Sequence, residues 1–489
     1  MAQPDPQAVA PWYLRNITQA LALNEATGNV YVRTDAQLTI GNVGNVNVTD
    51  VEILALGNID ISGNTMPVSG NVTVFQGTDP WVVNGNVNAT ITGGNVSTTI
   101  GGTNLDAFGR LRVSNPVTLF DSQNRYIDGD QFSNITATGG NVVYVANESS
   151  FNLNVSTASG SSVIRQSRTV QAYQPGKSLL IMNTFAMATL KANLTQRVGY
   201  FTADNGIYFE AVGTTLNLVI RSSVTGGVVE ERIPQASWNG NTLLSGTVLD
   251  PTLTQIFWCD VEWLGVGNVR TGFVINGEFI VCHTFQHANQ PGNTTVYMTT
   301  ATLNPRYEIT NTGATSGAST MKQICSTVIS EGGYNPSTSI NYVPTSIAPT
   351  RIATGNVYTA LASIRLNPAY PDAVVVPAQI DLLLTDVQYG SFQLVLNAGN
   401  VVANTGSWSN AASSVVQYNT SALQIGDGTV VYSGLTSSRD TITISEDIKR
   451  RLQLSRTAAG TPDILTLCVG YQSNNADLLW KFGWEELTN

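Results

Sequence analysis

The chain has 489 residues, but only 11% of them are charged, against roughly 25% in ordinary soluble proteins. The formal net charge is −10, and no cluster of basic residues stands out, which excludes a nucleic-acid partner because phosphate recognition needs a concentrated basic surface. No apolar run approaches the roughly 20 residues of a membrane span, so we expect no membrane insertion.

Residues 11–24 are the first predicted element, a short amphipathic helix. Pro11 suits the first helical position. The predicted apolar face carries Trp12, Leu14, Ile17 and Leu21. A helix ahead of a repetitive segment has nothing of its own to pack on. We therefore predict that residues 1–27 are an anchor that docks on another protein or self-associates, with a loosely docked tail as the alternative.

Residues 28–116 repeat the pair Gly-Asn followed by a small or β-branched residue. Short alternating runs follow the pairs, and alternation of apolar and polar residues is typical of half-buried strands. Gly-Asn supplies the positive-φ positions that a tight turn between strands requires. The predicted apolar row consists of Val46, Val48, Ile59, Ile61, Val72 and Val74.

Strands this short cannot bury a core of their own. They either stack as a solenoid or wind around a shared apolar axis with two further copies of the chain. The spacing of the Gly-Asn pairs is irregular, which disfavours a solenoid with matching rungs. We predict an intertwined homotrimeric β shaft. A flexible linker is the remaining alternative, and the persistent alternation argues against it.

The segment Asp106–Ser122, where charged and aromatic residues return, resembles a segment of virion structural proteins of tailed bacteriophages, often fibres. The resemblance covers about 106–334. Its further motifs are Tyr173–Ser178, Gly199–Phe201, Asp204–Glu210, Trp263–Gly267, Gly272–Gly277, Arg306–Gly313 and Ile329–Tyr334.

Two β-sandwich domains are predicted after the shaft, so the chain as a whole is expected to be all-β. In 117–334 the predicted strands are Asn141–Val145, Ser162–Gln171, Leu216–Ser222, Gln255–Glu262, Thr271–Ile275 and Glu278–Cys282. Their order, with a Phe-Val-Ile-Asn-Gly-Glu-Phe hairpin after an acidic strand, looks like a concanavalin-type jelly roll. The Pro/Ser/Thr-rich stretch 335–349 is a predicted linker.

The second domain spans 350–489. Its predicted strands are Tyr358–Leu366, Ile380–Asp386, Phe392–Leu396, Ser413–Asn419, Ile464–Gly470 and a closing strand through Leu479–Trp484, with a helix at Ile448–Leu454.

The best candidate for catalysis is the pair Asp260 and Glu262, which share one face of a predicted strand. Jelly-roll glycosidases use such pairs, but their pattern Glu-x-Asp-x-x-Glu meets Trp258 at its first position here. We therefore favour a solvated polar face opposite the row of Phe257, Cys259 and Val261, and predict that the chain is not an enzyme.

Metal and cofactor sites are also not expected. His283 and His287, the only histidines, lack the further ligands of a metal site. The four cysteines, Cys259, Cys282, Cys325 and Cys468, contain no CxxC pair and are predicted to be free thiols of a protein assembled in a reducing cytosol.

The resemblance implies a structural part of a phage particle. We expect a homotrimeric tail or collar fibre, anchored to other virion proteins through its N-terminus and exposed on the particle, that binds a host glycan or receptor. Glycan contacts are predicted at Trp238, Tyr334 and Trp408. A head fibre or capsid decoration protein is the alternative, and a polysaccharide-degrading tailspike is a more distant one.

Overall fold

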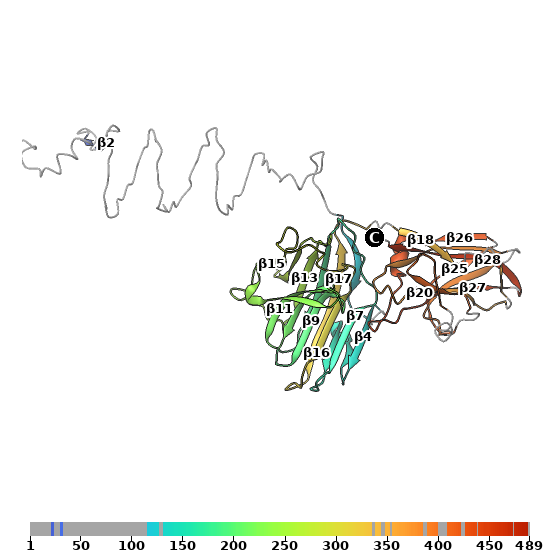
Figure 1. Cartoon of the computed structure of the whole chain (residues 1–489), viewed down its shortest axis with the longest axis horizontal. Helices are drawn as coiled ribbons and strands as arrows, with labels where there is room; N and C mark the ends of the chain where they lie inside the picture. The colour runs from blue at the N-terminus through green and yellow to red at the C-terminus, as the bar shows by residue number, and fades with distance from the viewer. Residues whose placement is uncertain are drawn as a thin grey trace, which may run out of the picture. The chain divides into compact units, whose positions relative to one another are not determined.

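Residues 117–330 form two stacked antiparallel sheets in the computed structural model of the chain, drawn from teal to yellow in Figure 1. The described residues are 21–23, 30–32, 115–126 and 131–487, the last range with gaps at 335–337, 344–347, 353–354, 385–388, 400–407, 422–425, 438 and 473. The predicted all-β fold class is confirmed for this part of the chain.

Sheet 1 of the first sandwich has seven strands. Their spatial order is β12 (Val229–Pro234), β11 (Thr215–Ser222), β10 (Gly206–Val212), β9 (Leu194–Phe201), β16 (Pro305–Asn311), β7 (Ser162–Ser167) and β4 (Phe132–Ala137).

Sheet 2 has eight strands. Their order is β15 (Glu278–Phe285), β14 (Val269–Ile275), β13 (Gln255–Val261), β8 (Leu179–Ala186), β17 (Ser319–Ser330), β6 (Ser150–Val155) and β5 (Asn141–Val145), with β3 (Val117–Ser122) paired to β17. The hairpin between β14 and β15 turns at Asn276 and Gly277, whose φ angles of 53° and 83° are those that an Asn-Gly turn requires.

Apolar side chains on alternate positions fill the space between the two sheets. Phe209 of β10 is fully buried and lies 5.1 Å, ring centroid to centroid, from Phe273 of β14 and 6.1 Å from both Phe185 and Phe257. The predicted inward row of β13, which includes Phe257, belongs to the same core cluster. Side chains at the intervening positions of both sheets therefore point away from the core.

The second sandwich, drawn in orange and red in Figure 1, has its own core and two further sheets. Sheet 3 contains β18 (Thr338–Val343), β28 (Ala476–Leu487), β21 (Val375–Leu384) and β26 (Arg439–Thr443), with β19 (Thr350–Ile352) paired to β28. Sheet 4 contains β23 (Ser409–Asn410), β24 (Val416–Asn419), β20 (Thr359–Leu366), β27 (Leu465–Tyr471), β22 (Gly390–Leu396) and β25 (Thr429–Thr436).

The described residues also include short helical segments. They are the 3₁₀ turns Ala146–Glu148 and Gln235–Ser237 and the helix α3 (Glu446–Arg451). Helix α3 lies close to the helix predicted at 448–454. Among the described residues there is no helix of the length and hydropathy needed to cross a membrane.

Two sequence predictions need correction. Leu21 was expected in a helix, but it begins strand β1 (Leu21–Leu23), which pairs antiparallel with β2 (Val30–Val32). The predicted linker 335–349 contains β18, because its alternating residues add a strand to sheet 3 beside β28.

The other predictions for the N-terminal part lie outside the described residues. They concern the anchor residues Trp12, Leu14 and Ile17 and the shaft row Val46, Val48, Ile59, Ile61, Val72 and Val74.

We expect Phe209→Ala to lower the free energy of unfolding by about 3–5 kcal/mol, because it removes a ring that contacts three others and leaves a cavity between the sheets. Chemical denaturation followed by tryptophan fluorescence measures this loss. The control Leu253→Ala removes a side chain that is 62% exposed and should change stability by less than about 0.5 kcal/mol. Equal losses in both variants would contradict the assigned core.

Candidate functional site

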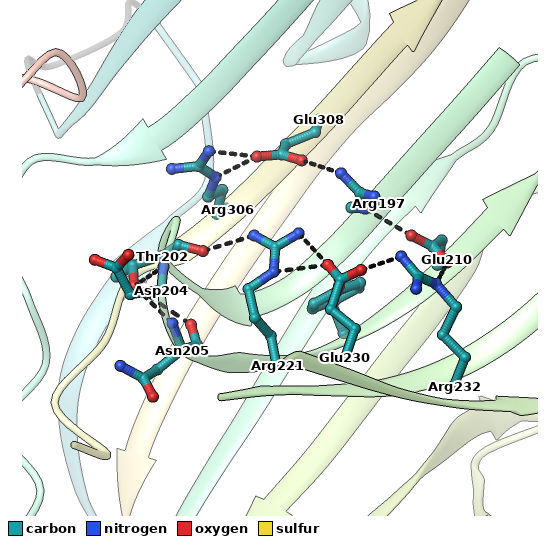
Figure 2. A network of polar contacts seen from close by, with 11 residues as sticks. Arg197, Thr202, Asp204, Asn205, Glu210, Arg221, Glu230, Arg232, Arg306 and Glu308 are labelled. Atoms are coloured by element: carbon teal, nitrogen blue, oxygen red, sulfur yellow. Dashed lines mark hydrogen bonds and ion pairs between the residues drawn. The ribbon is translucent and has the colours of Figure 1, made fainter. Parts of the chain in front are cut away.

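A continuous row of ion pairs crosses the outer face of sheet 1 (Figure 2). Along the row, arginine and glutamate alternate in the order Arg306, Glu308, Arg197, Glu210, Arg232, Glu230 and Arg221. We call this set the charged ladder. It is continuous because strand register places oppositely charged side chains opposite each other on one face.

Arg197 of β9 links the two strands on either side of it in the charged ladder. It lies directly opposite Glu308 of β16 on one side and Glu210 of β10 on the other. Its Nη1 is 3.1 Å from Glu308 Oε2, and its Nε is 2.7 Å from Glu210 Oε2. Glu210 is fully buried, and its second oxygen lies 2.9 Å from Nε of Arg232. One buried carboxylate therefore joins two guanidinium groups.

An aromatic floor lies beneath the arginines. Phe201, Tyr208 and Val219 form a separate, fully buried cluster on this face of the sheet. The guanidinium of Arg221 lies 5.0 Å from the ring centroid of Tyr208, and that of Arg306 lies 5.4 Å from Phe201, both within cation–π range. The long arginine side chains thus cover apolar rings that the sheet would otherwise expose to water.

Two carboxylates of the charged ladder, Glu230 and Glu308, are poor general acids. Burial by itself raises the pKa of Glu230, but hydrogen bonds from the Tyr208 hydroxyl and the Arg221 guanidinium outweigh it and hold the pKa at about 2. Burial likewise opposes ionisation of Glu308, but the charges of Arg306 and Arg197 keep its pKa below the ordinary value. A general acid requires a raised pKa, so neither Glu230 nor Glu308 is suited to donate a proton in catalysis.

Glu210→Gln should lower the free energy of unfolding by about 3 kcal/mol, because it leaves Arg197 and Arg232 without the anion that joins them. Urea denaturation at pH 7 measures the change. The matched control is Glu148→Gln in the exposed pair with Lys322, which should leave the denaturation midpoint unchanged. If the Glu210→Gln midpoint also stays in place, the charged ladder does not stabilise the fold.

The lowered pKa values of Glu230 and Glu308 predict acid sensitivity. In the folded state both lie below the ordinary value of 4.5, so their contribution to stability is complete above about pH 4.5 and is lost as the pH falls toward 2. We therefore expect the free energy of unfolding to decrease over this window. The decrease should be shallower in Glu230→Gln, as measured by denaturation at successive pH values; identical slopes would refute the assignment.

Four motifs that are distant in the sequence meet at one end of the first sandwich. The ring of Tyr173 contacts that of Trp263 edge-on, with centroids 5.7 Å apart, and the Leu264 amide donates to the Tyr173 hydroxyl at 3.0 Å. Ser178 donates through its hydroxyl to the Glu331 carboxylate at 2.5 Å. The amide of Asn115 donates to the Glu331 carbonyl at 3.1 Å, so the chain enters the sandwich here.

A cavity of about 460 Å³, which we call the junction pocket, opens at this end. Its charged and hydroxyl-bearing lining residues include Lys177, Ser178, Asp260, Glu262, Arg270 and Glu331. Both candidate catalytic carboxylates of the sequence analysis are therefore in one pocket, together with Glu331, which the sequence analysis placed only within a motif. No sequence signal indicated that Glu331, from the far end of β17, would join them.

The two predicted carboxylates differ in their surroundings. Asp260 is buried and accepts hydrogen bonds from the Arg270 guanidinium, with Nε at 2.9 Å. Glu262 is exposed, and its carboxylate has no partner among the described residues. Trp258, at the position where the glycosidase pattern has Glu, is buried and lies 5.5 Å from the Phe279 ring. Of these two carboxylates, that of Asp260 is paired with a cation and that of Glu262 is not.

Both histidines have structural partners. His283 accepts a hydrogen bond at Nδ1 from the Asn239 amide at 3.1 Å, and His287 Nδ1 lies 2.8 Å from the Gly267 carbonyl while its ring stacks on Tyr297. Burial lowers the pKa of both imidazoles. Across the described part of the chain, no group of three or more His, Cys, Asp or Glu side chains is arranged to hold a metal ion.

The four cysteines are free thiols, as predicted. Burial raises the pKa of Cys282 and of Cys468 to about 12, and it also raises the pKa values of Cys259 and Cys325. Such thiols are unreactive as nucleophiles at neutral pH.

The three residues predicted to contact glycan have different positions. Trp238 is 4% exposed and donates through Nε1 to the Ile233 carbonyl at 3.1 Å, so the prediction for it is corrected: it is a core residue. Tyr334 is half-buried against Val170, Ala172 and Val374. Trp408 is half-buried at the start of β23, and the Arg365 guanidinium lies 4.1 Å from its ring centroid.

Amide side chains that the sequence did not single out are linked to Trp408 through Arg365. Gln417 accepts from Arg365 at 2.8 Å and donates to Asn410 at 3.0 Å, and the Asn367 amide lies 3.4 Å from the same Asn410 oxygen. We call these residues with Trp408 the amide surface. Only strand pairing between β20, β24 and β23 brings them together.

Comparison with known proteins gives similarities of structure alone. No protein-family model matches the chain, and no curated protein matches it. Similar solved structures include a β-1,3-glucanase from Mycobacterium marinum, with 12% identity, a TM-score of 0.31, and coverage of 43% of this chain and 98% of that one. A family 16 glycosyl hydrolase from Mycobacterium smegmatis has 9% identity, a TM-score of 0.32, and coverage of 43% and 100%.

A carbohydrate esterase from the Shiga toxin-encoding bacteriophage phi24B is also similar, with 12% identity, a TM-score of 0.28, and coverage of 44% of this chain and 100% of that one. This comparison contradicts the prediction that the chain is not an enzyme. The similar structures are those of glucanases and other carbohydrate-active enzymes. At these identities the similarity concerns the fold and assigns no catalytic role to any residue of this chain.

Proposed function

We propose that this chain is a structural protein of a tailed-phage virion, a homotrimeric tail or collar fibre that attaches the particle to the host surface. The observation that carries the proposal is the meeting of four motifs at the junction end of the first sandwich. These motifs carry the resemblance to phage virion proteins. Their mutual contacts support the interpretation that they belong to one structural unit.

The amide surface is the proposed contact with a host glycan. An aromatic ring stacks on the C–H face of a sugar, while amide groups donate to and accept from its hydroxyls. Trp408 supplies the ring, and Asn367, Asn410 and Gln417 supply amides beside it. Tyr370, 48% exposed, follows Asn367 closely and adds a second ring.

Binding of the full-length protein to an array of bacterial surface polysaccharides tests this role. We expect Trp408→Ala to weaken binding at least tenfold, because it removes the stacking ring. Tyr389→Ala is the matched control, since Tyr389 is 72% exposed but outside the amide surface, and its binding should equal that of the wild type. Equal binding by all three proteins would exclude the amide surface as the contact.

The same samples distinguish the remaining functions. Sedimentation velocity should give an elongated trimer of the 52.1-kDa chain, and a compact monomer would contradict the fibre. Antibody labelling of virions by electron microscopy separates a tail or collar fibre from a head fibre. Release of reducing ends from any bound polysaccharide, lost in Glu262→Gln, would instead identify a polysaccharide-degrading spike.

A further inference from the structure

The junction pocket lies where the N-terminal part of the chain joins the first sandwich, and it has no role in the proposed attachment to glycan. We propose that it is the docking site for the Arg110–Arg112 segment of the same chain. The charges of the pocket, the reach of the chain and the chemistry of arginine support this docking.

The carboxylates that line the pocket outnumber its cationic side chains. The three carboxylates of the lining, Asp260, Glu262 and Glu331, face two cationic side chains. The guanidinium of Arg270 is bound to Asp260, and the Lys177 amine donates to Gln174 at 2.8 Å. The Glu262 carboxylate is without a partner among the described residues. A cation that enters the pocket therefore finds a free carboxylate at Glu262.

The Glu331 carboxylate adds acceptor capacity next to it. Among the described residues, the side-chain partner of this carboxylate is the Ser178 hydroxyl, a neutral donor at 2.5 Å. A carboxylate offers about four lone-pair sites, so one hydroxyl leaves room for further donors. An occupant with several N–H donors is therefore favoured over one with a single donor.

Chain connectivity brings such an occupant within reach. The hydrogen bond from the Asn115 amide to the Glu331 carbonyl, 3.1 Å long, fixes the entering chain beside the pocket. Arg112 is three residues before Asn115 and Arg110 is five residues before it, and an extended chain spans at most about 3.6 Å per residue. Their Cα atoms therefore lie within about 11 Å and 18 Å of the Asn115 Cα.

Arginine fits this pocket better than other residues of the entering chain. Its guanidinium carries five N–H donors in a planar fork that matches carboxylate geometry, and it stays protonated at every physiological pH. Residues two apart lie on one face of an extended segment, so one arginine can reach each of two carboxylates. Because the segment is tethered, its effective concentration at the pocket is in the millimolar range.

Limited trypsin digestion of the full-length protein tests the docking directly, because trypsin cleaves after arginine. The bonds after Arg110 and Arg112 should be protected relative to the bond between Arg125 and Tyr126, which are both exposed residues. In Glu262→Gln, and more so with Glu331→Gln added, cleavage after Arg112 should accelerate at least tenfold. Cleavage after Arg125 should keep its wild-type rate, which also shows that the sandwich is folded.

The matched control is Glu278→Gln. Glu278 is an exposed glutamate that follows the Asn276-Gly277 turn, at the other end of β14 from the pocket residue Asn268. The substitution Glu278→Gln should therefore leave every cleavage rate unchanged. Charge reversal supplies a rescue: Glu262→Lys alone should expose the Arg110–Leu111 bond, and adding Arg112→Glu should protect it again.

Two outcomes would overturn the proposal. Wild-type cleavage after Arg112 as fast as after Arg125 would show that the segment is not docked. If protection from trypsin after Arg112 disappears on hundredfold dilution, the segment that docks in the pocket comes from another copy of the chain. Neither outcome depends on glycan binding, so failure of this proposal is distinguishable from failure of the proposed attachment function.

Discussion

The packing of two sheets against each other is the constraint on which the first sandwich depends. Phe209, Phe257 and Phe273 meet between the sheets because every second side chain of a strand points to the same face. The same rule sends the intervening side chains outward, where they are free to serve other purposes. The outer face of sheet 1 carries the ion pairs of the charged ladder. Residues of sheet 2 contribute to the lining of the junction pocket.

The charged ladder shows how a low-charge chain uses the charges that it has. Burying an ion is costly unless partners and hydrogen bonds compensate for lost hydration, and here each glutamate contacts at least two side-chain partners. The arginines in turn cover Phe201 and Tyr208, so one set of side chains neutralises charge and shields apolar rings. This arrangement gives the face rigidity rather than acid–base chemistry.

The junction end connects the organisation of the chain with its proposed function. Strand β3 enters beside β17, and the backbone of Glu331 bonds to both Asn115 and Ser178. In the proposed fibre, the contacts gathered at this point would fix the chain where it enters the first sandwich. The amide surface belongs to the second sandwich and rests on a different set of strands from the junction end.

Local pattern in the sequence determined the all-β class, six strands in each sandwich and the Asn-Gly turn, because alternation and turn chemistry depend on neighbouring residues. It also placed Asp260 and Glu262 on one face of a strand. Tertiary structure alone decided that Trp238 is buried, that Glu331 joins the two carboxylates, and that Arg197 lies between Glu210 and Glu308. These outcomes depend on which segments become neighbours and in what register, and contacts such as that between Arg197 and Glu308, 111 positions apart, leave no mark in a local pattern.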